Sequence, residues 1–535
     1  MVMETINETQ TESQNTIPTD LSHIELNEKF LHAINMVEKS QKNIFITGKA
    51  GTGKSTLLQY FKKTTKKKIV VLAPTGVAAL NVGGQTIHSF FRFQPDINPS
   101  IVEKYLGHNK ELYKIIETII IDEISMVRAD LLDCIDKFLR LNGKNKNKPF
   151  GGVQMIFIGD LYQLPPVIKG KEREIFKKHY KSQYFFDAKV FENLEMEFIE
   201  LEKIYRQKDP QFIELLNAVR NRSVTEQDIK EINKRLNPDF EPPQNDFYIN
   251  LTTTNDLSNM INEKELLKLK GELFNFKGKI KGKFDKKDLP TENDLKLKIN
   301  SQIMLINNDP MHKWVNGTIG KIIDIKKDEK EAIILELSNN KKVKVGKFTW
   351  DIYKLYYNKE TKTLDSDIIG SFTQYPLRLS WAVTIHKGQG KTFDKVIIDI
   401  GKGTFSHGQV YVALSRCTTL DGIILKKPIE KKHIFMDWKI VNFLTKYQYQ
   451  LSNKKLSLEN KMEMIKKAIK NKSKLDIIYL KSSDVKTKRT ISPKRMGTME
   501  YLGKKYTGVE AYCHLRQDDR VFRVDKILEL NESKS

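Results

Sequence analysis

The residues with the clearest chemical meaning are residues 48–55, which read Gly-Lys-Ala-Gly-Thr-Gly-Lys-Ser. An apolar run, residues 43–47, precedes this stretch, and a helical pattern, residues 56–61, follows it. The order strand, glycine loop and helix is the context in which this spacing binds phosphate. Backbone N–H groups of such a loop converge on phosphate oxygens, and the helix N-terminus adds a favourable dipole. The sequence therefore predicts a site for a nucleoside triphosphate.

Each residue type in this loop has its own task. We expect Lys54 to reach the β- and γ-phosphates and Ser55 to bind Mg²⁺. Glycines are needed where the backbone must bend into unusual conformations close to phosphate. The cofactors predicted are ATP and Mg²⁺. The loop residues expected to contact them are Gly48, Gly51, Thr52, Gly53, Lys54, Ser55 and Thr56.

Two acidic residues follow a second apolar run, residues 118–121. Asp122 is placed to hold the shell of the Mg²⁺ ion, and Glu123 is placed to orient or deprotonate an attacking water. Paired acids at a strand end are common in proteins. Their position downstream of a phosphate loop, in the same alternating region, makes the catalytic interpretation the stronger one.

Hydrolysis also needs a sensor for the γ-phosphate and positive charge on the transition state. Gln163 follows the strand-like run 155–159 and is the candidate sensor. Arg206 and Arg416 are the candidate arginine fingers. Taken alone, a glutamine is more often a surface residue and an arginine more often a solvated charge, so these three assignments depend on context.

Length and charge narrow the class of protein. A chain of 535 residues suggests three or four domains, and a hydrophobic content of 39% is enough for real cores. The formal net charge of +24 favours a polyanionic partner. A lysine-rich proteome would explain the same charge about equally well.

The few scattered cysteines indicate a reducing compartment. Cys134, Cys417 and Cys513 are scattered and show no metal-ligand spacing, and we expect a cytoplasmic protein. The longest apolar runs are far too short to span a bilayer, so no membrane partner is predicted. Residues 1–20 are polar, show no signal-peptide pattern, and are interpreted as a disordered tail.

Strand and helix patterns alternate over two parts of the chain, which predicts an α/β fold with buried parallel sheets. The first part covers residues 21–200 and the second covers residues 201–445. Expected strands in the first are 44–47, 69–73, 118–122 and 155–159, and in the second 247–251, 396–400 and 422–425.

Three other segments differ from these α/β regions in composition and in their predicted secondary structure. Residues 265–370 are rich in lysine, carry short β-like runs at 302–306, 318–325 and 332–337, and predict a small β-barrel-like insertion. Residues 446–455 are polar and predict a linker. Residues 456–535 open with an amphipathic helix and continue as short strands, which predicts a separate C-terminal domain.

Together these and other stretches resemble the PIF family of superfamily 1 DNA helicases. They run in family order over about residues 24–445, and residues 130–154 resemble the signature that separates PIF helicases from RecD-type relatives. The matching stretches are 48–55, 73–79, 85–90, 121–126, 149–154, 159–167, 205–207, 252–256, 307–309, 314–317, 381–390 and 409–417.

The resemblance implies two RecA-like domains with ATP between them and a Src-homology-3-like insertion in the second. Residues 85–93 would form a small wedge, Arg206 and Arg416 would be fingers from the second domain, and Gly390 would contact the nucleotide. The implied activity is ATP-driven 5′-to-3′ movement on single-stranded DNA with unwinding of duplex, forked or otherwise structured DNA. The implied protein is a monomer that serves DNA repair, recombination and telomere-like maintenance.

The resemblance also implies a track for single-stranded DNA, which physically needs a basic groove with stacking or hydroxyl contacts. The implied track residues are Thr75, His88, Thr254, Thr384, His386 and Lys387. One departure concerns the base of the nucleotide. Family members carry a glutamine upstream of the phosphate loop that grips adenine, whereas residues 26–30 read Leu-Asn-Glu-Lys-Phe, so the preference for adenine stays open.

Residues 456–535 resemble a WYL domain, a small Sm-like β-fold. The stretches that carry the likeness are 468–469, 478–479, 489–493, 511–516 and 520–527, and the namesake Trp-Tyr-Leu position reads Thr507-Gly508-Val509. Arginines and aromatic residues together suit nucleic acid, whereas a structural cap with a solvated basic face is the alternative. The proposed set is Arg489, Arg516 and Arg520 with Tyr479, Tyr512 and Phe522.

Two functions from different classes fit these features. The first is a helicase motor. The second is a nucleotide-switched DNA-binding regulator whose WYL domain senses a ligand. Paired arginines, a γ-phosphate sensor and the coupling segment 388–390 favour the motor, because a pure switch does not need them. A nuclease or relaxase finds no support, since no catalytic Tyr/His cluster or nuclease acid set stands outside the nucleotide motifs.

Overall fold

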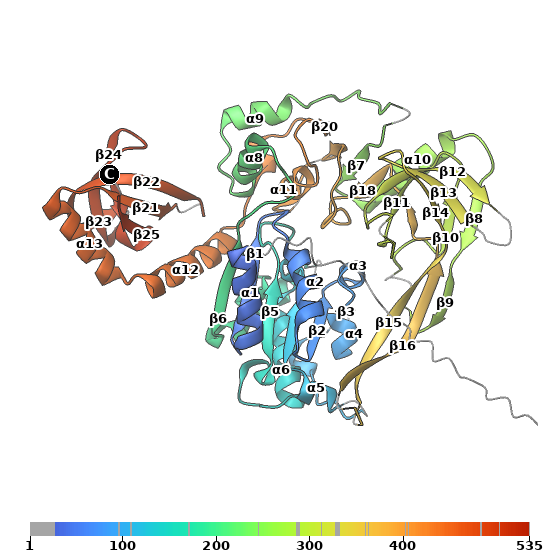
Figure 1. Cartoon of the computed structure of the whole chain (residues 1–535), viewed down its shortest axis with the longest axis horizontal. Coiled ribbons are helices and arrows are strands. Elements are labelled where there is room, and N and C mark those ends of the chain that lie inside the picture. The colour runs from blue at the N-terminus through green and yellow to red at the C-terminus, as the bar shows by residue number, and fades with distance from the viewer. Residues whose placement is uncertain are drawn as a thin grey trace, which may run out of the picture.

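The computed structural model describes residues 27–533, apart from 95–96, 108–109, 169–171, 244–245, 285–288, 312, 327–331, 359, 362, 402, 405, 482–483 and 502. The tail predicted for residues 1–20 lies outside the described residues. Figure 1 shows a central parallel sheet with a second α/β unit above it, antiparallel strands to the right and a C-terminal module to the left. Within the described part of the chain, no helix is both long and apolar enough to cross a membrane.

The first unit is built on a six-stranded parallel sheet with the strand order β3-β2-β4-β5-β1-β6. Its strands are β1 (Asn43–Gly48), β2 (Ile69–Ala73), β3 (Gln85–Thr86), β4 (Thr118–Ile121), β5 (Gln154–Ile158) and β6 (Met196–Leu201). Its helices are α1 (Glu28–Lys39), α2 (Lys54–Thr64), α3 (Gly76–Asn81), α4 (Ile87–Phe91), α5 (Leu112–Ile115), α6 (Ala129–Asn142) and α7 (Glu172–His179).

The four inner strands of this sheet, β2, β4, β5 and β1, are largely apolar on both faces because both faces are covered. Ile44 packs in one cluster with residues of α1 and α2, while its neighbour Phe45 packs in another cluster with residues of α6. Successive side chains of a strand point to opposite faces, so continuous apolar runs are what a doubly covered parallel sheet requires. The prediction of a buried parallel α/β sheet is confirmed.

The second unit has a four-stranded parallel sheet in the order β18-β7-β19-β20. Its strands are β7 (Ile249–Thr252), β18 (Ala382–Thr384), β19 (Val396–Asp399) and β20 (Ile423–Leu425). The helices in this part of the chain are α8 (Pro210–Arg220), α9 (Glu226–Asn233), α10 (Asn255–Lys268) and α11 (Gln409–Leu414). Helix α8 packs against α11, so the start of the region joins its end.

Antiparallel strands interrupt this second sheet between α10 and β18. They are β8 (Phe274–Lys277), β9 (Lys279–Gly282), β10 (Asp294–Leu297), β11 (Gln302–Leu305), β12 (Ile319–Lys326), β13 (Ala332–Leu337), β14 (Lys342–Val345), β15 (Phe348–Asn358), β16 (Thr363–Gln374) and β17 (Leu377–Leu379). Five of them form the sheet β14-β13-β12-β11-β17. The β structure is shifted toward the C-terminus relative to the expected 265–370, because α10 continues to Lys268 and β17 ends at Leu379.

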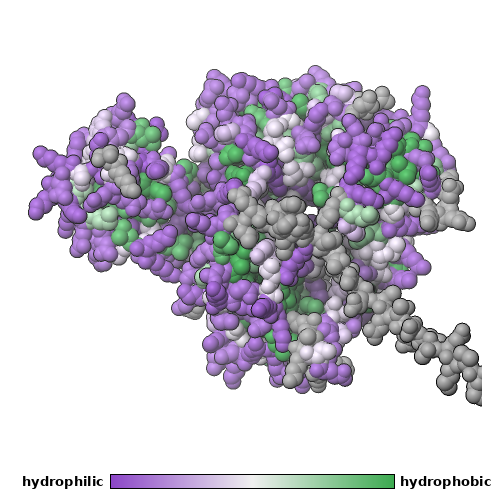
Figure 2. Space-filling view, viewed as in Figure 1, coloured by the Kyte–Doolittle hydropathy of each residue, from purple (hydrophilic) through white to green (hydrophobic). Residues whose placement is uncertain are grey.

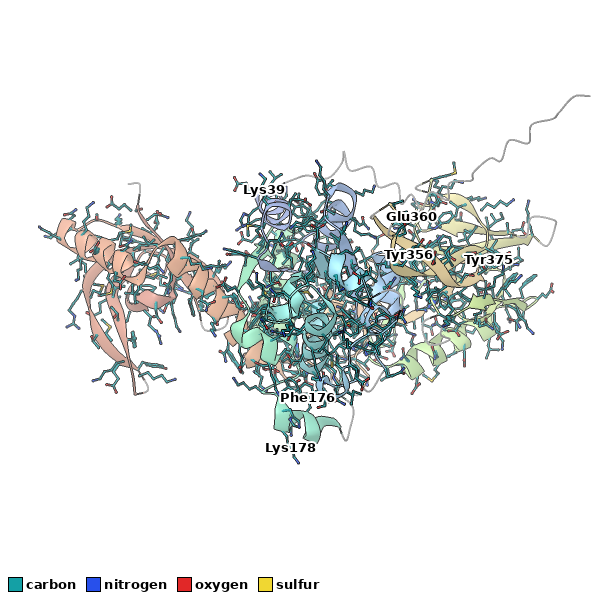
Figure 3. The ribbon with its side chains drawn as sticks, turned by 90° about the horizontal axis from the view of Figure 1, so that it is seen from below. Lys39, Phe176, Lys178, Tyr356, Glu360 and Tyr375 are labelled. Atoms are coloured by element: carbon teal, nitrogen blue, oxygen red, sulfur yellow. The ribbon has the colours of Figure 1, made fainter. Side chains whose placement is uncertain are left out.

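A long hairpin links this insertion back to the first unit. Strands β15 and β16 pair along their whole length, and Figure 3 labels Tyr356 and Glu360 near their turn. Strand β15 contacts α5, and the Gln85 side-chain amide donates to the carbonyl oxygen of Tyr353 at 2.5 Å. The hairpin therefore lies against the segment 85–93 that was predicted to be a wedge.

The chain leaves the second unit through one long helix, α12 (Trp438–Lys455), and enters the C-terminal module. The prediction of a linker at 446–455 is wrong, since these residues are the second half of α12 and Gln448 and Ser452 are buried. The module contains α13 (Leu458–Asn471) and strands β21 (Leu475–Leu480), β22 (Lys486–Tyr501), β23 (Lys504–Cys513), β24 (Asp518–Arg523) and β25 (Ile527–Glu532). They form an antiparallel sheet in the order β24-β23-β22-β21-β25.

Helix α12 returns to the first unit and packs on aromatic side chains there. The Phe443 ring stacks on Phe186 with ring centroids 4.3 Å apart, and it also contacts Phe45 and Phe185 at 6.1 Å. Tyr447, one turn further, stacks on Phe198 of β6. Aromatic packing of this kind adds to the burial of large apolar surfaces. This packing holds α12 against the first unit.

We predict that Phe443→Ala costs about 3 kcal/mol of stability, because it removes a ring from this aromatic cluster and leaves a cavity. Urea unfolding followed by circular dichroism measures the effect. The matched control is Trp438→Ala on the same helix, since Trp438 is 50% exposed. Equal shifts of the two midpoints would contradict the packing of α12 described here.

Candidate active site between the two parallel sheets

The glycine loop, residues 48–55, joins β1 to α2. Gly51 and Gly53 have φ angles of +80° and +83°, in the left-handed region that favours glycine. A Cβ atom on Gly51 would lie 2.6 Å from the Cβ of Arg206, and one on Gly53 would lie 3.0 Å from the ring of Phe30. The loop is therefore glycine-rich for two reasons, its backbone conformation and the close approach of its neighbours.

Lys54 begins α2 and points back over the loop. Its ammonium group donates to the carbonyl oxygens of Gly48 at 2.7 Å and Lys49 at 2.9 Å. Burial lowers the pKa of Lys54, while the nearby carboxylates of Asp160 and Glu123 oppose this shift. A buried ammonium group beside the loop is the arrangement that binds β- and γ-phosphates.

The loop lines a cavity of about 370 Å³. Residues from both units form its wall. They are 50–56, Glu123, Gln163, Tyr205, Arg206, Gly390, Thr392 and Arg416. Of the predicted catalytic residues, Lys54, Glu123, Gln163, Arg206 and Arg416 all meet in this one cavity, and Gly390 joins them. The sequence motifs are far apart in the chain, so this convergence is a property of the fold.

The two acids stand side by side at the end of β4. Asp122 is 8% exposed. Burial, followed by repulsion from Glu123, raises the pKa of Asp122 to about 7. Burial also raises the pKa of Glu123, whose backbone is left-handed with φ 50°. Gln389 of the second unit donates its amide to a Glu123 carboxylate oxygen at 2.9 Å. A carboxylate with a raised pKa, held from across the cleft, suits a general base.

These acids also bear on the metal ion that the resemblance implies. Asp122 and Ser55 supply the hard oxygen ligands that Mg²⁺ prefers, and two buried carboxylates together favour a nearby cation. The donor set therefore fits the ion, with Ser55 and Asp122 as the residues that would hold it. The ion would supply positive charge that neutralises the charge developing on the phosphates.

Both candidate arginine fingers are mostly enclosed and rest on backbone carbonyls. Arg416 is 1% exposed, and its guanidinium donates to the carbonyl oxygens of Val412 at 2.9 Å and Lys391 at 3.2 Å. Burial, and then repulsion from Arg206, lower the pKa of Arg416 to about 9. Arg206 donates to the carbonyl oxygen of Ser415 at 3.2 Å. Two cations at one cavity favour an anionic ligand between them.

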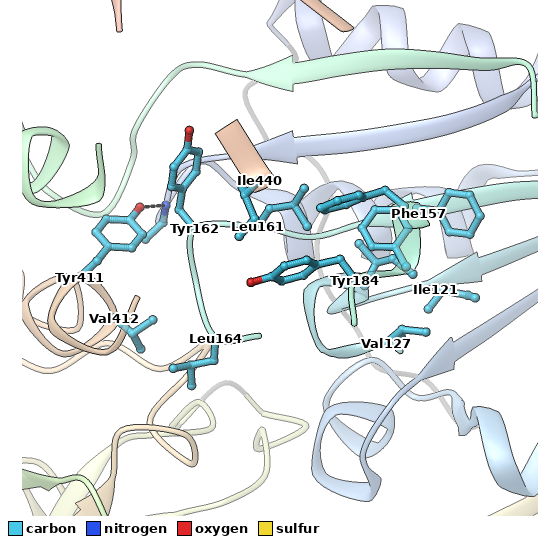
Figure 4. Close-up of a cluster of buried hydrophobic side chains, with 14 of the residues drawn as sticks. Ile121, Val127, Phe157, Leu161, Tyr162, Leu164, Tyr184, Tyr411, Val412 and Ile440 are labelled. Atoms are coloured by element: carbon cyan, nitrogen blue, oxygen red, sulfur yellow. Dashed lines mark hydrogen bonds between the residues drawn. The ribbon is translucent and has the colours of Figure 1, made fainter. Parts of the chain in front are cut away.

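Sequence reasoning missed residues that bind the two units together here. Asp160, whose side chain is fully buried, accepts from Arg220 at 3.3 Å and from the Tyr411 hydroxyl at 3.3 Å. The same Tyr411 hydroxyl accepts the backbone N–H of Ala50 at 2.9 Å, the bond drawn in Figure 4. Asp160 and Tyr411 both lie in stretches that carried the family resemblance, but no residue pattern pointed to Arg220.

The departure at residues 26–30 has a local structural role. The Asn27 side chain caps α1 by accepting the N–H of Phe30 at 3.0 Å, and its amide donates to the Tyr205 hydroxyl at 3.0 Å. Tyr205 lines the nucleotide cavity and is 39% exposed. The Asn27 amide is thus engaged within the protein, and an exposed aromatic ring stands beside the cavity.

The six residues predicted for the DNA track divide by exposure. Thr75 and Thr254 are exposed and occupy equivalent places, because each caps the helix that follows the strand β2 or β7. Lys387 is exposed, whereas His88 and His386 are partly buried, and burial lowers the pKa of His386. Thr384 is 4% exposed, and its hydroxyl accepts the Lys387 N–H, so it shapes the turn.

The three arginines predicted for the C-terminal module also differ. Arg516 and Arg520 are exposed. Arg489 is 7% exposed, and its guanidinium donates to Cys513 Sγ at 3.3 Å and to the Thr487 hydroxyl at 3.1 Å. A nucleic-acid contact should be largely exposed, so the prediction of this role is wrong for Arg489, whose side chain the sheet turns into the interior of the module.

Comparison with known proteins agrees with the site. Residues 25–230 match the family model described as PIF1-like helicase, and residues 460–532 match the WYL domain. The chain is 35% identical over 403 residues to the ATP-dependent DNA helicase Pif1 of Campylobacter jejuni, covering 70% of this chain and 87% of that protein. It is 30% identical to the yeast helicase RRM3 but spans only 63% of that longer protein.

Solved structures of Pif1 from Bacteroides sp share the fold. The complex with ADP-AlF4 superposes with a TM-score of 0.73 at 36% identity, covering 80% of this chain and 98% of that one. The complex with ADP-AlF3 and single-stranded DNA has a TM-score of 0.59 at 37% identity, covering 79% and 97%. The chain as a whole therefore superposes better on the first complex than on the second.

We predict that Glu123→Gln keeps nucleotide bound and stops turnover, because the shape of the site survives while the carboxylate base is lost. Lys54→Ala should instead weaken nucleotide binding itself. Nucleotide affinity and phosphate release, measured separately for both variants, check these outcomes. Turnover at the wild-type rate in Glu123→Gln would remove this residue from the mechanism.

Proposed function

The chain belongs to the PIF1-like helicase family, and from that premise we propose that it uses ATP hydrolysis to move along single-stranded DNA and unwind duplex DNA. One observation carries the proposal. The glycine loop, the base candidate Glu123 and two arginines from separate parts of the chain line the same cavity. A cavity completed by both units lets a hydrolysis cycle change how the units sit on each other.

In this proposal each residue of the cavity has one task. Lys54 binds the β- and γ-phosphates, and Glu123 takes a proton from the attacking water, while Gln163 contacts the γ-phosphate. Arg206 and Arg416 stabilise the charge that spreads over the transferred phosphoryl group. The raised pKa of Glu123 supports its role, since a stronger base accepts a proton more readily at neutral pH.

Single-stranded DNA is the proposed track. Thr75 and Thr254 lie at equivalent helix starts of the two units and are exposed, so each unit offers one matching contact. The net charge of +24 favours a polyanion. Relatives with solved structures bound single-stranded DNA or forked duplex DNA, which supports the same ligands here. His88, His386 and Lys387 complete the proposed track. Thr384 supports it by accepting the backbone N–H of Lys387.

Further details of the fold and its setting are part of the proposal. The two parallel sheets are the RecA-like pair, the five-stranded antiparallel sheet is the Src-homology-3-like insertion, and the C-terminal sheet is Sm-like. Residues 85–93, which face the β15–β16 hairpin, are the wedge. We expect a cytoplasmic monomer that uses Mg²⁺. The regulator alternative is weaker, because a switch has no need of two arginines at the cavity.

We predict 5′-to-3′ polarity. A duplex with only a 5′ single-stranded tail should be opened, and one with only a 3′ tail should not. Strand separation on the two substrates at equal enzyme and ATP concentrations tests this, with DNA affinity recorded at several salt concentrations. Affinity should fall steeply with salt, because phosphate contacts release counterions. Equal unwinding of both substrates would contradict the assigned direction.

We also propose that the C-terminal module (residues 456–533) binds single-stranded DNA through Arg516 and Arg520. The side of this module seen in Figure 2 is mostly hydrophilic. Each lost phosphate contact should lower the salt slope of binding by about 1. Arg516→Ala with Arg520→Ala should therefore weaken DNA binding and reduce the slope by about 2.

The matched control for this pair is Arg495→Ala. Arg495 lies on the same sheet and is paired with Glu510 at 2.7 Å, closer than the 3.8 Å between Arg520 and Asp518. Deletion of residues 456–535 should likewise leave a DNA-stimulated ATPase with weaker DNA affinity. Unchanged affinity and salt slope in the double arginine variant would assign the module to another ligand.

A further inference from the structure

The turn between β21 and β22 of the C-terminal module touches the motor (residues 27–437) beside the nucleotide site. Asp484 in this turn is 9% exposed and left-handed, with φ 58°. One of its carboxylate oxygens accepts the Tyr162 hydroxyl at 2.8 Å, and the other accepts the Gln448 amide of α12 at 2.7 Å. Tyr162 directly precedes Gln163, the candidate γ-phosphate sensor. The module thus reaches the loop that carries this sensor.

The contact continues into the motor through a buried cation. The guanidinium of Arg220 lies 4.0 Å from the centre of the Tyr162 ring and 3.3 Å from an oxygen of Asp160. The side chains of Arg220 and Asp160 are 4% and 0% exposed. Buried charges need close partners, so Arg220 is held between the Tyr162 ring and the Asp160 carboxylate. The Asp484 carboxylate adds its charge to this environment.

Asp160 connects Arg220 to the nucleotide site through its second carboxylate oxygen. Its second carboxylate oxygen accepts from the Gln163 amide at 3.4 Å and from the Tyr411 hydroxyl at 3.3 Å. Tyr411 in turn holds the backbone N–H of Ala50 in the glycine loop. Figure 4 shows Tyr162 and Tyr411 near each other at this end of the buried cluster. Contacts therefore run without a gap from the C-terminal module to the sensor and to the loop.

The module is held in place by more than this one turn. Lys486, just after the turn, pairs with Glu200 of β6 at 2.7 Å. Ser452 of α12 donates to the carbonyl oxygen of Leu528 in β25 at 2.7 Å. These contacts restrict movement of the module relative to the motor. The position of Asp484 is therefore set by the fold rather than by a flexible tether.

We propose that Asp484 is a positioning residue for ATP hydrolysis, acting through Tyr162 and Arg220 on the loop that carries Asp160 and Gln163. The proposal rests on the ATPase activity proposed above. Without the Asp484 carboxylate, the Tyr162 hydroxyl and the Gln448 amide lose their acceptor, and the sensor loop loses one of its supports. The glycine loop keeps its own contacts. The loss should therefore fall on the chemical step and leave nucleotide binding nearly intact.

Two substitutions test this in the full chain. Asp484→Gly removes the carboxylate and tolerates the left-handed backbone, and Tyr162→Phe removes only the hydroxyl. Each should lower the DNA-stimulated kcat about fivefold, the value of one hydrogen bond, with little change in KM for ATP. The double variant should be no slower than the slower single variant, because both remove the same contact. Asp484→Asn, which keeps one acceptor oxygen, should retain more activity than Asp484→Gly.

Nucleotide affinity gives a second readout that a merely structural role would not move. Affinity for ADP should stay the same in the variants, while affinity for ADP with aluminium fluoride, which imitates the transferred phosphoryl group, should fall. The matched control is Glu510→Gln. Glu510 is a carboxylate on the same sheet that pairs with Arg495, and its side chain is 40% exposed.

Several results would overturn the proposal. They are a wild-type kcat in Asp484→Gly and Tyr162→Phe, losses that add in the double variant, or an equal loss in Glu510→Gln. If Asp484→Gly fails to fold by circular dichroism, Tyr162→Phe decides alone. A wild-type chain without DNA-stimulated hydrolysis would instead refute the proposed function, so the two failures are distinguishable.

Discussion

A single buried carboxylate, Asp160, organises the meeting of the two units. Its side chain is fully buried, so its charge must be compensated within the protein. Arg220 and the Tyr411 hydroxyl, which both lie outside the first sheet, donate to it. The backbone N–H of Tyr162 binds it at 3.1 Å from its own loop. Removing one partner of such a group is costly because the other is left unpaired. The cleft that contains the nucleotide cavity is built around this requirement.

The hydrogen bonds of the two cavity arginines suggest how nucleotide binding would move the units. Arg206 and Arg416 now donate to carbonyl oxygens of Ser415 and Val412, which are neutral acceptors. A triphosphate would offer them charged acceptors, and charge-assisted hydrogen bonds are the stronger ones. Differential affinity of this kind is what shifts a protein between two arrangements. Tyr411 and Gln389 already bridge the cleft through hydrogen bonds to Ala50 and Glu123, so the proposed cycle would act on contacts that join the two units.

The sequence predicted the part of the site that depends on local pattern. Lys54 and Glu123 follow strand-like runs, and the structure brings them to one cavity. Arg220 could not be chosen, because its partner Asp160 is 60 residues away and any one basic side chain resembles the others. The sequence predicts that Gln448 lies in a polar linker, yet its amide binds Asp484 in the interior. The sequence predicts that Arg489 contacts nucleic acid, yet its guanidinium lies 5.8 Å from the centre of the Phe522 ring inside the module. Composition reports polarity, whereas burial is decided by the distant segments that pack together.

The two arginines complete the site only if their guanidinium groups contact the transferred phosphoryl group when nucleotide binds. A crystal structure of the full chain with Mg²⁺, ADP and aluminium fluoride measures this directly. We predict that the guanidinium groups of Arg206 and Arg416 lie about 3 Å from the fluoride group, at hydrogen-bonding distance. Arginines that remain on the carbonyl oxygens of Ser415 and Val412, with the fluoride group bound by the glycine loop alone, would contradict a site built from both units.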